Sequence, residues 1–274
     1  MPEFNMPKKT GSYNRLNLLD AVLKRMAPVV VAYSGGLDSS FLLWACSQAL
    51  PANQIQAVTF HSAATPIREI EAAELTASFL NVKHNIYPGP EMKSEEFLAN
   101  DLLRCYYCKR ERFAFLLSLK AEFAGTRFIE GSVVDDLDDF RPGMRALKEA
   151  GIDSPLLEAG ISKEDINIIA GDYYLPFAGK KTESCLATRI KTGHRIETLI
   201  LEQVQVAEDA IHELGFQLVR VRWHAGEARL EFDQGDLERA FVLRREITRR
   251  VKECGFSIVS LDFEGYKTAR KEKI

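Results

Sequence analysis

The sequence has 274 residues, of which 46% are apolar and 27% are charged, and its formal net charge at pH 7 is −3. These values are typical of a soluble protein with one large domain or two, and no apolar run approaches the roughly 18 to 20 residues that a membrane-spanning helix needs. The near-balanced charge argues against wholesale nucleic-acid binding, and the N-terminus lacks the apolar core of a secretory signal, so we expect a cytoplasmic protein.

Strands and helices alternate in the first half of the chain. Apolar spacing predicts a helix around residues 16–23, and the run at 28–33 predicts a buried strand. The next predicted elements are a helix from Phe41, a strand at 55–60, a helix at 67–80, a strand at 82–86, a helix at about 95–120 and a strand at 126–130. No hairpin signal separates the strands, so we expect an α/β fold whose parallel sheet has helices on both faces.

The second half of the chain changes character. Residues 141–174 are helical with breaks, and Ser162 with Asp165 predicts a capping box. A polar stretch at 176–193 leads to a pattern of helix, strand, strand, helix and strand, predicted from Ile200 and at 218–223, 228–232, 237–253 and 256–263. We therefore place a domain boundary near residue 192, which gives a large α/β domain at 1–192 and a small α+β domain at 193–274.

A glycine loop between the first strand and its helix predicts a phosphate site. The segment reads Ser34-Gly35-Gly36-Leu37-Asp38-Ser39-Ser40. Two glycines let the backbone approach a phosphate, the following helix presents free N–H groups, and the serine hydroxyls add donors. Asp38 would then bind Mg²⁺. A plain helix cap is the simpler reading of an isolated glycine pair, but this motif in this context is more restrictive.

The loop resembles that of the PP-loop ATP pyrophosphatases, and it contains no Walker motif. That resemblance implies a fold of the adenine nucleotide alpha hydrolase type, in which ATP adenylates a substrate oxygen and pyrophosphate leaves. It also implies that the base lies at the ends of the first two strands, beside Ala32, Tyr33, Phe60 and His61. Gly131, at the end of the fourth strand, faces the same edge of the sheet. The acidic run that follows it lines the site or is a solvated loop: Asp135, Asp136, Asp138 and Asp139.

The five cysteines divide into two groups. Cys46 and Cys254 lie on apolar helical faces and are interpreted as core residues. Cys105 and Cys108 form a Cys-x-x-Cys, and Cys185 lies in a polar segment rich in cations. Three thiolates suit an iron–sulfur cluster with one open iron better than a structural zinc, although a redox pair or simple helix packing also explains the Cys-x-x-Cys spacing.

The motifs after the loop resemble the ATP-dependent sulfur transferase family LarE, which builds the nickel-pincer nucleotide cofactor. These motifs are residues 131–143, Ser-Pro-Leu-Leu-Glu-Ala-Gly at 154–160, Ser-Cys-Leu-Ala-Thr-Arg at 184–189 and Leu-Asp-Phe-Glu-Gly-Tyr at 261–266. The resemblance implies that a carboxylate of pyridinium-3,5-biscarboxylic acid mononucleotide is adenylated and then receives sulfur. It further implies a homo-oligomer, commonly a hexamer.

Two versions of the sulfur step exist in that family. In one, the cysteine matching Cys185 forms a thioester with the substrate and gives up its own sulfur. In the other, three cysteines matching Cys105, Cys108 and Cys185 hold a [4Fe–4S] cluster, and sulfide from a donor binds its open iron. Because all three cysteines are present, the cluster version is the prediction.

The substrate's phosphate and carboxylates require cations. Arg220 and Arg222 alternate along a predicted strand and match the family's phosphate-binding arginines, while Thr188 and Arg189 belong to the motif around the sulfur-bearing cysteine. A solvated strand face is the alternative reading of the arginine pair. Glu208 and Glu231 either bind a metal or orient substrate, with a surface position as the simpler expectation for both.

Three other functions remain open. A tRNA thiolation enzyme also joins this loop to cysteines, but no strongly basic tract appears in the sequence. An ammonia-using synthetase of the same superfamily would not need three cysteines. A nucleotide sensor or structural zinc protein would bind ATP without releasing pyrophosphate. The prediction is therefore an enzyme that uses ATP, Mg²⁺ and a cluster on a small nucleotide substrate.

Overall fold

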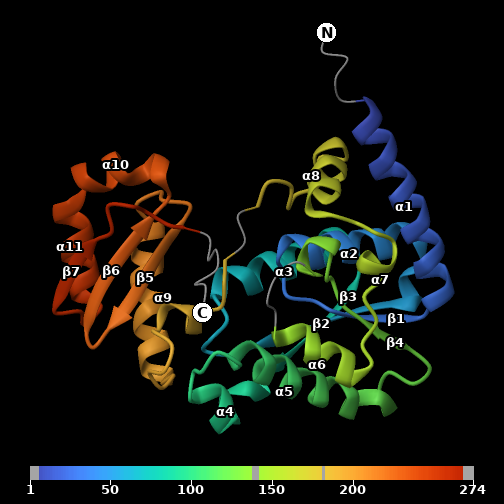
Figure 1. Cartoon of the computed structure of the whole chain (residues 1–274), viewed down its shortest axis with the longest axis horizontal. Helices are drawn as coiled ribbons and strands as arrows, with labels where there is room; N and C mark the ends of the chain where they lie inside the picture. The colour runs from blue at the N-terminus through green and yellow to red at the C-terminus, as the bar shows by residue number, and fades with distance from the viewer. Residues whose placement is uncertain (1–5, 138–141, 181–182, 268–274) are drawn as a thin grey trace. The chain divides into compact units, whose positions relative to one another are not determined.

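The structure, a computed structural model, describes residues 6–137, 142–180 and 183–267 (Figure 1). Its contacts divide the chain into two compact units. The first comprises Met1–Phe97 and Leu103–Glu183, and the second comprises Leu98–Leu102 and Ser184–Ile274. The predicted boundary at residue 192 lies inside the second unit, because residues 184–190 make their hydrogen bonds with that unit.

The first unit contains the predicted parallel sheet. Its strands are β1 (Val29–Ala32), β2 (Ile55–His61), β3 (Lys83–Pro88) and β4 (Arg127–Ile129). They are ordered β3-β2-β1-β4, all parallel, with Val30 of the central strand paired to Gln56 on one side and Phe128 on the other. The run of apolar β-branched residues in β1 fits this position, because a central parallel strand is buried on both faces.

Helices cover both faces of this sheet. Side chains of β1 alternate between two cores: Val29 and Val31 pack with α1 (Met6–Met26), α2 (Leu37–Ala49), α3 (Ile67–Phe79) and α8 (Lys163–Asp172). Val30 points to the opposite face and packs with α5 (Arg104–Ser118) and α6 (Pro142–Ala150). The remaining helical segments of this unit are η2 (Ala52–Gln54), η3 (Pro90–Lys93), α4 (Glu95–Leu98), η4 (Leu119–Ala121), η5 (Val134–Leu137) and α7 (Pro155–Glu158). The α/β class predicted from the sequence is confirmed.

The helix expected at about 95–120 is the main correction to the predicted elements. It is divided into α4 and α5, and the residues between them belong to the second unit. Asn100 is fully buried at a φ of 57°. Its side-chain amide donates to the carbonyls of Ile190, Lys191 and His194, at 3.4, 3.1 and 2.9 Å. The break was not visible in the apolar spacing because its partners lie about ninety residues further along the chain.

The second unit has the predicted order of elements. It contains η6 (Leu186–Arg189), α9 (Thr198–His212), β5 (Val219–His224), β6 (Glu227–Phe232), η7 (Gln234–Asp236), α10 (Leu237–Val242), α11 (Arg244–Glu253) and β7 (Ile258–Leu261). The three strands are ordered β5-β6-β7, with an antiparallel first pair and a parallel second pair. In the described part of the chain, no helix combines the length and apolarity needed to cross a membrane.

The predicted capping box is present and reaches beyond its own helix. Ser162 Oγ accepts from the Asp165 N–H, and the Asp165 carboxylate accepts from the Ser162 N–H and from Ser12 Oγ. Arg15 of α1 adds an ion pair to the same carboxylate. Burial alone would raise the pKa of Asp165, but these donors hold it far below its ordinary value.

We expect Asp165→Asn to lower the free energy of unfolding by about 2 kcal/mol at pH 7, because it removes the charge that Arg15 and both serines bind. The depressed pKa means that the carboxylate's contribution is present above its unfolded pKa of about 3.9 and is lost as the pH falls below it. Urea unfolding at pH 7 measures the first effect, and the same measurement at pH 2 measures the second. The exposed Asp172, on the same helix and paired with Lys9, is the control, and an equal loss in Asp172→Asn would contradict the prediction.

Candidate active site around the glycine loop

The glycine loop is a tight turn that joins β1 to α2. Its serine hydroxyls make hydrogen bonds to other groups of the same loop. Ser34 Oγ lies 3.0 Å from Ser39 Oγ, and Ser39 Oγ donates to the Gly36 carbonyl at 3.1 Å. Gly36 directly precedes the first residue of α2. The first N–H groups of an α-helix have no acceptor within the helix itself, so the beginning of α2 is a favourable position for an anion.

Two positions of the site need glycine because backbone atoms of other segments approach them closely. Gly35 has a φ of +78°, and a Cβ there would lie 2.6 Å from the backbone oxygen of Glu69. A Cβ at Gly131, at the end of β4, would lie 3.1 Å from the backbone nitrogen of Ser39. Side chains at these positions would push α3 and β4 away from the loop, so both glycines shape the loop and the beginning of α2.

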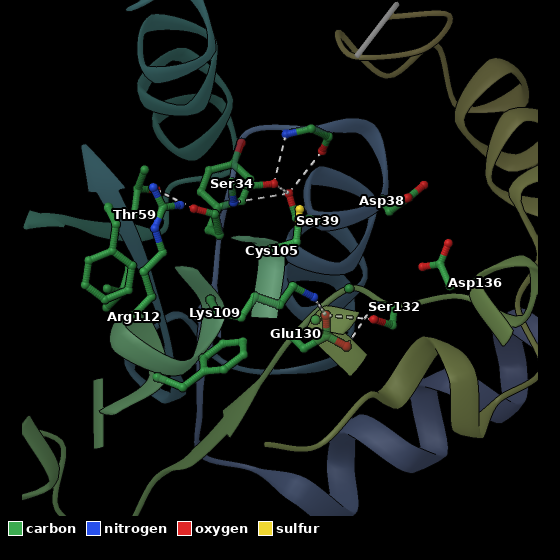
Figure 2. A pocket seen from close by; sticks show the side chains of 18 of the residues that line it. Ser34, Asp38, Ser39, Thr59, Cys105, Lys109, Arg112, Glu130, Ser132 and Asp136 are labelled. Carbon is green, nitrogen blue, oxygen red and sulfur yellow. Dashed lines mark hydrogen bonds and ion pairs between the residues drawn. The ribbon is translucent and has the colours of Figure 1, made fainter. Parts of the chain in front are cut away.

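A cavity of about 560 Å³ opens beside this loop in the first unit (Figure 2). Most of the predicted nucleotide-binding residues line it: Ala32, Tyr33, Ser34, Gly36, Asp38, Ser39, Phe60 and Gly131. Three others lie elsewhere. His61 is exposed outside the lining, Gly35 supports the loop from behind, and the buried Ser40 bonds to the Gly35 carbonyl and Tyr33 Oη. Ser40 therefore supports the turn in this structure and does not face the cavity.

Two carboxylates of the lining share one cation. Asp38 from α2 and Asp136 from η5 each lie 3.9 Å from the ammonium group of Lys163. Asp135 is exposed and accepts from the Lys163 N–H, while Asp138 and Asp139 lie outside the described residues. Among the described residues no cluster of three or more histidines, cysteines or acids is placed to hold a metal. Two carboxylates around a cation position nevertheless fit Mg²⁺, which typically takes one or two protein carboxylates together with substrate phosphates.

Sequence reasoning missed a cationic wall on α5. Cys105, Lys109, Arg112 and Phe113 all line the cavity, and their spacing of four, three and one residues places them on one helix face. In Figure 2, Lys109 and Cys105 lie between the aspartates on one side of the view and Arg112 with Thr59 on the other. The helical spacing after Cys105 was the available signal for this wall.

The cationic side chains of this wall are held in place by their neighbours. Lys109 lies 3.9 Å from the Glu130 carboxylate, and its aliphatic stem packs on Gly143, where a Cβ would lie only 2.7 Å from Lys109 Cδ. Arg112 donates to both oxygens of the fully buried Glu91, at 3.0 and 2.6 Å. Burial alone would raise the pKa of Glu91, but Arg112 holds it below its ordinary value.

Of the two cysteines interpreted as core residues, Cys46 lies in the core and Cys254 is only partly buried. Cys46 is fully buried, and burial raises the pKa of its thiol, as it does for the partly buried Cys254. Cys105 and Cys108 lie in the first turns of α5, and Cys105 lines the cavity. Cys185 directly precedes η6 in the second unit and is partly exposed. Two of the three cysteines proposed as cluster ligands, Cys105 and Cys108, therefore lie on one helix.

The predicted substrate residues of the second unit form a buried ion-pair network. Arg189 is fully buried, and its guanidinium binds both oxygens of Glu208 at 2.8 and 2.9 Å. Arg222 binds Glu231 through two nitrogens and donates to the Thr188 carbonyl at 2.8 Å. Arg220 is fully buried, with its guanidinium 5.1 Å from the centre of the Tyr266 ring.

Two expectations for this unit were wrong. Glu208 and Glu231 are 1% and 6% exposed, so neither occupies the surface position favoured from the sequence. Arg220 is fully buried with its guanidinium beside the Tyr266 ring, so the alternative reading of a solvated strand face does not apply to it. The two glutamates are buried because each is paired with a guanidinium group, Glu208 with Arg189 and Glu231 with Arg222.

This chain is similar to one protein family and to several known proteins. Residues 15–107 match the asparagine synthase family. A pyridinium-3,5-bisthiocarboxylic acid mononucleotide synthase of Lactiplantibacillus plantarum is 29% identical over 252 residues, which cover 92% of this chain and 91% of the relative. An uncharacterized protein of Synechocystis, slr1717, is 33% identical over 247 residues, covering 89% of this chain and 92% of the relative. A protein of Methanocaldococcus jannaschii, MJ0830, is 28% identical over 240 residues, covering 88% and 91%.

Proposed function

We propose that this chain, which belongs to the LarE family of PP-loop ATP pyrophosphatases, adenylates a carboxylate of pyridinium-3,5-biscarboxylic acid mononucleotide and converts it to a thiocarboxylate. The observation that carries the proposal is the loop cavity, which combines helix N–H groups, two serine hydroxyls and a cationic wall. Such a site fits a nucleotide triphosphate. The similarity to the Lactiplantibacillus synthase supports the choice of substrate.

The first chemical step follows from the cavity lining. A substrate carboxylate oxygen attacks the α-phosphorus of ATP, a P–O bond forms, and pyrophosphate leaves with the bond electrons. Lys109, held in the cavity beside Glu130, would stabilise the negative charge that develops on the α-phosphate. Asp38 and Asp136 would hold Mg²⁺, which would supply charge neutralisation to the leaving pyrophosphate.

The second step needs a sulfur nucleophile. Sulfur attacks the acyl carbon of the adenylate, the C–O bond to AMP breaks, and a thiocarboxylate remains when sulfide is the donor. Cys105, Cys108 and Cys185 would hold a [4Fe–4S] cluster whose open iron would present sulfide. The donor chemistry fits, because two thiols share the first turns of α5 and a third lies in a partly exposed segment. In the sacrificial alternative, the Cys185 thiolate displaces AMP to form a thioester. Elimination then removes the Cα proton of Cys185 and breaks its Cβ–Sγ bond, which leaves a dehydroalanine and the thiocarboxylate.

The substrate's own charges are assigned to the second unit. We assign the phosphate to Arg220 and Arg222, with Thr188 and Arg189 beside them in the segment that carries Cys185. Arg222 is 21% exposed at its side chain and already ordered by Glu231, so it would present a preoriented fork to an anion. A homo-oligomer remains a prediction of the family resemblance.

The test is a reconstitution without oxygen. Protein purified under nitrogen is assayed for iron, sulfide and visible absorption, and is then given ATP, Mg²⁺, the biscarboxylate mononucleotide and sulfide. We expect cluster absorption, pyrophosphate release and the mass gain of an oxygen-to-sulfur exchange on the substrate. Iron-free protein that loses sulfur from Cys185 would overturn the cluster and keep the family. Absence of pyrophosphate release, or sulfur incorporated into added tRNA instead, would overturn the proposed reaction.

A further inference from the structure

One buried carboxylate holds the last residues of the first unit before Cys185. Glu69, in the first turn of α3, is 4% exposed, and its two oxygens bind two different residues that precede Cys185. Lys180 Nζ lies 2.9 Å from Oε2, and the Glu183 N–H donates to Oε1 at 3.2 Å. A carboxylate removed from water needs hydrogen-bond donors to offset its lost hydration. These two contacts therefore hold Lys180 and Glu183 to Glu69.

The same ammonium group also binds the glycine loop. Lys180 Nζ donates to the Gly35 carbonyl at 3.0 Å, and its side chain is only 22% exposed. Gly35 in turn packs against the backbone of Glu69, where a Cβ would approach to 2.6 Å. The glycine loop, α3 and the segment leading to Cys185 therefore meet at one ammonium group. We call Glu69, Lys180 and the Glu183 N–H the Glu69 clamp.

Lys180 and a bound nucleotide would contact opposite ends of the same peptide group. The Gly35 carbonyl and the Gly36 N–H belong to one planar trans peptide, so they point in opposite directions. Gly36 lines the cavity, whereas the carbonyl is bound by Lys180. The Gly36 N–H donates to Ser34 Oγ at 3.4 Å. A charged phosphate that took the place of this hydroxyl would polarise the peptide more strongly and strengthen the bond from Lys180 on the other side.

Covalent geometry extends the effect of the clamp to the sulfur-bearing residue. Cys185 follows Glu183 by two residues, and successive Cα atoms are about 3.8 Å apart, so its Cα lies within about 8 Å of the Glu183 Cα. A clamp that fixes Glu183 restricts Cys185 to that range.

We propose that Lys180 is a positioning residue that couples nucleotide binding in the glycine loop to the ordering of the Cys185 segment. This inference rests on the proposed function, because it gives the coupling a purpose: the sulfur-bearing segment is held in place once the nucleotide that forms the adenylate is bound. Lys180 does not line the cavity, and its ammonium group binds Glu69 and the Gly35 carbonyl.

The test compares hydrogen exchange with and without saturating ATP and Mg²⁺ in the anaerobically purified full chain. In the unmodified protein, we expect ATP to slow exchange at least about fivefold in peptides from the glycine loop and in peptides spanning 183–190. In Lys180→Met, protection of the loop should persist, while protection of 183–190 should fall to within about twofold of the ATP-free rate. Lys180→Arg, which retains a cation, should restore it. Lys120→Met, at an exposed lysine of η4, should behave as the unmodified protein.

A second measurement links the clamp to the reaction. The yield of thiocarboxylate per pyrophosphate released should fall at least about fivefold in Lys180→Met, since an adenylate that waits for sulfur is open to hydrolysis. If the unmodified protein makes no thiocarboxylate, the proposed function fails while the exchange experiment still decides the clamp.

Two results would overturn the clamp itself. One is an unmodified protein whose 183–190 exchange ignores ATP although it makes product. The other is Lys180→Met with full ATP-dependent protection of those residues. If Lys180→Met does not fold, Glu69→Gln provides the same comparison, because it removes the charge that Lys180 binds and keeps an acceptor. Full protection in Glu69→Gln would equally overturn the proposal.

Discussion

Gly35→Ala is expected to reduce ATP-dependent pyrophosphate release at least about 100-fold, which corresponds to about 2.7 kcal/mol of transition-state stabilisation. The new Cβ would lie 2.6 Å from the Glu69 backbone oxygen, at a φ of +78° that disfavours any side chain. Relief of that contact has to move either the glycine loop or the first turn of α3. Either movement displaces the helix N–H groups and hydroxyls that face the cavity, so the loss should appear in pyrophosphate release.

The chain offers a matched control for this substitution. Gly125 has nearly the same φ, +76°, but nothing lies within 4 Å of a Cβ placed there. Gly125→Ala therefore carries the backbone cost alone, and its pyrophosphate release should stay within about twofold of the unmodified protein. Equal losses in the two variants, with equal unfolding free energies, would show that backbone strain and not the contact with Glu69 is responsible. Full release by Gly35→Ala would contradict the assigned phosphate site.

Cys185→Ala is expected to abolish thiocarboxylate formation, to below about one hundredth of the unmodified protein, while pyrophosphate release continues. Both versions of the sulfur step need this thiol, either as the sulfur donor or as a ligand of the cluster. Adenylation, in contrast, takes place at the glycine loop. Mass spectrometry of the nucleotide product and a pyrophosphate assay measure the two steps separately. Cys254→Ala, at a thiol whose pKa is raised by burial, serves as the control and should keep both.

The remaining cysteines distinguish the two versions. If a cluster delivers sulfide, Cys105→Ala and Cys108→Ala should lose the product together with the visible absorption of the protein. If Cys185 is sacrificed, both variants should still produce up to one thiocarboxylate per chain. If Cys185→Ala made the ordinary amount of thiocarboxylate, both versions would be contradicted. The sulfur nucleophile would then have to come from a group other than this thiol.

Local sequence predicted the elements and the phosphate loop because both depend on neighbouring residues. The Val29–Val31 run predicted a central strand, the glycine pair predicted the turn after it, and Ser162 with Asp165 predicted a helix cap, which the hydrogen bonds confirm. Each of these patterns extends over a few residues, and its physical cause, such as burial on two faces or an unpaired N–H group, acts within that range.

The errors came from residues whose partners are distant in the sequence. Asn100 ends a helical pattern because it binds carbonyls near residue 190. Glu208 is buried, contrary to expectation, because Arg189 comes to it from another segment. Neither position differs locally from an ordinary polar surface residue, so composition and spacing could not identify it.

The sequence by itself determined the α/β class, the family and a set of chemically capable residues, because apolar periodicity and short motifs are properties of contiguous residues. Only the tertiary structure decided which of those residues meet. It brought Lys109 and Arg112 into the loop cavity, buried Arg189 against Glu208, and joined Lys180 to Glu69 and Gly35. The physical reason is that a buried charge takes its partner from whatever segment packs beside it, and packing is a property of the whole fold.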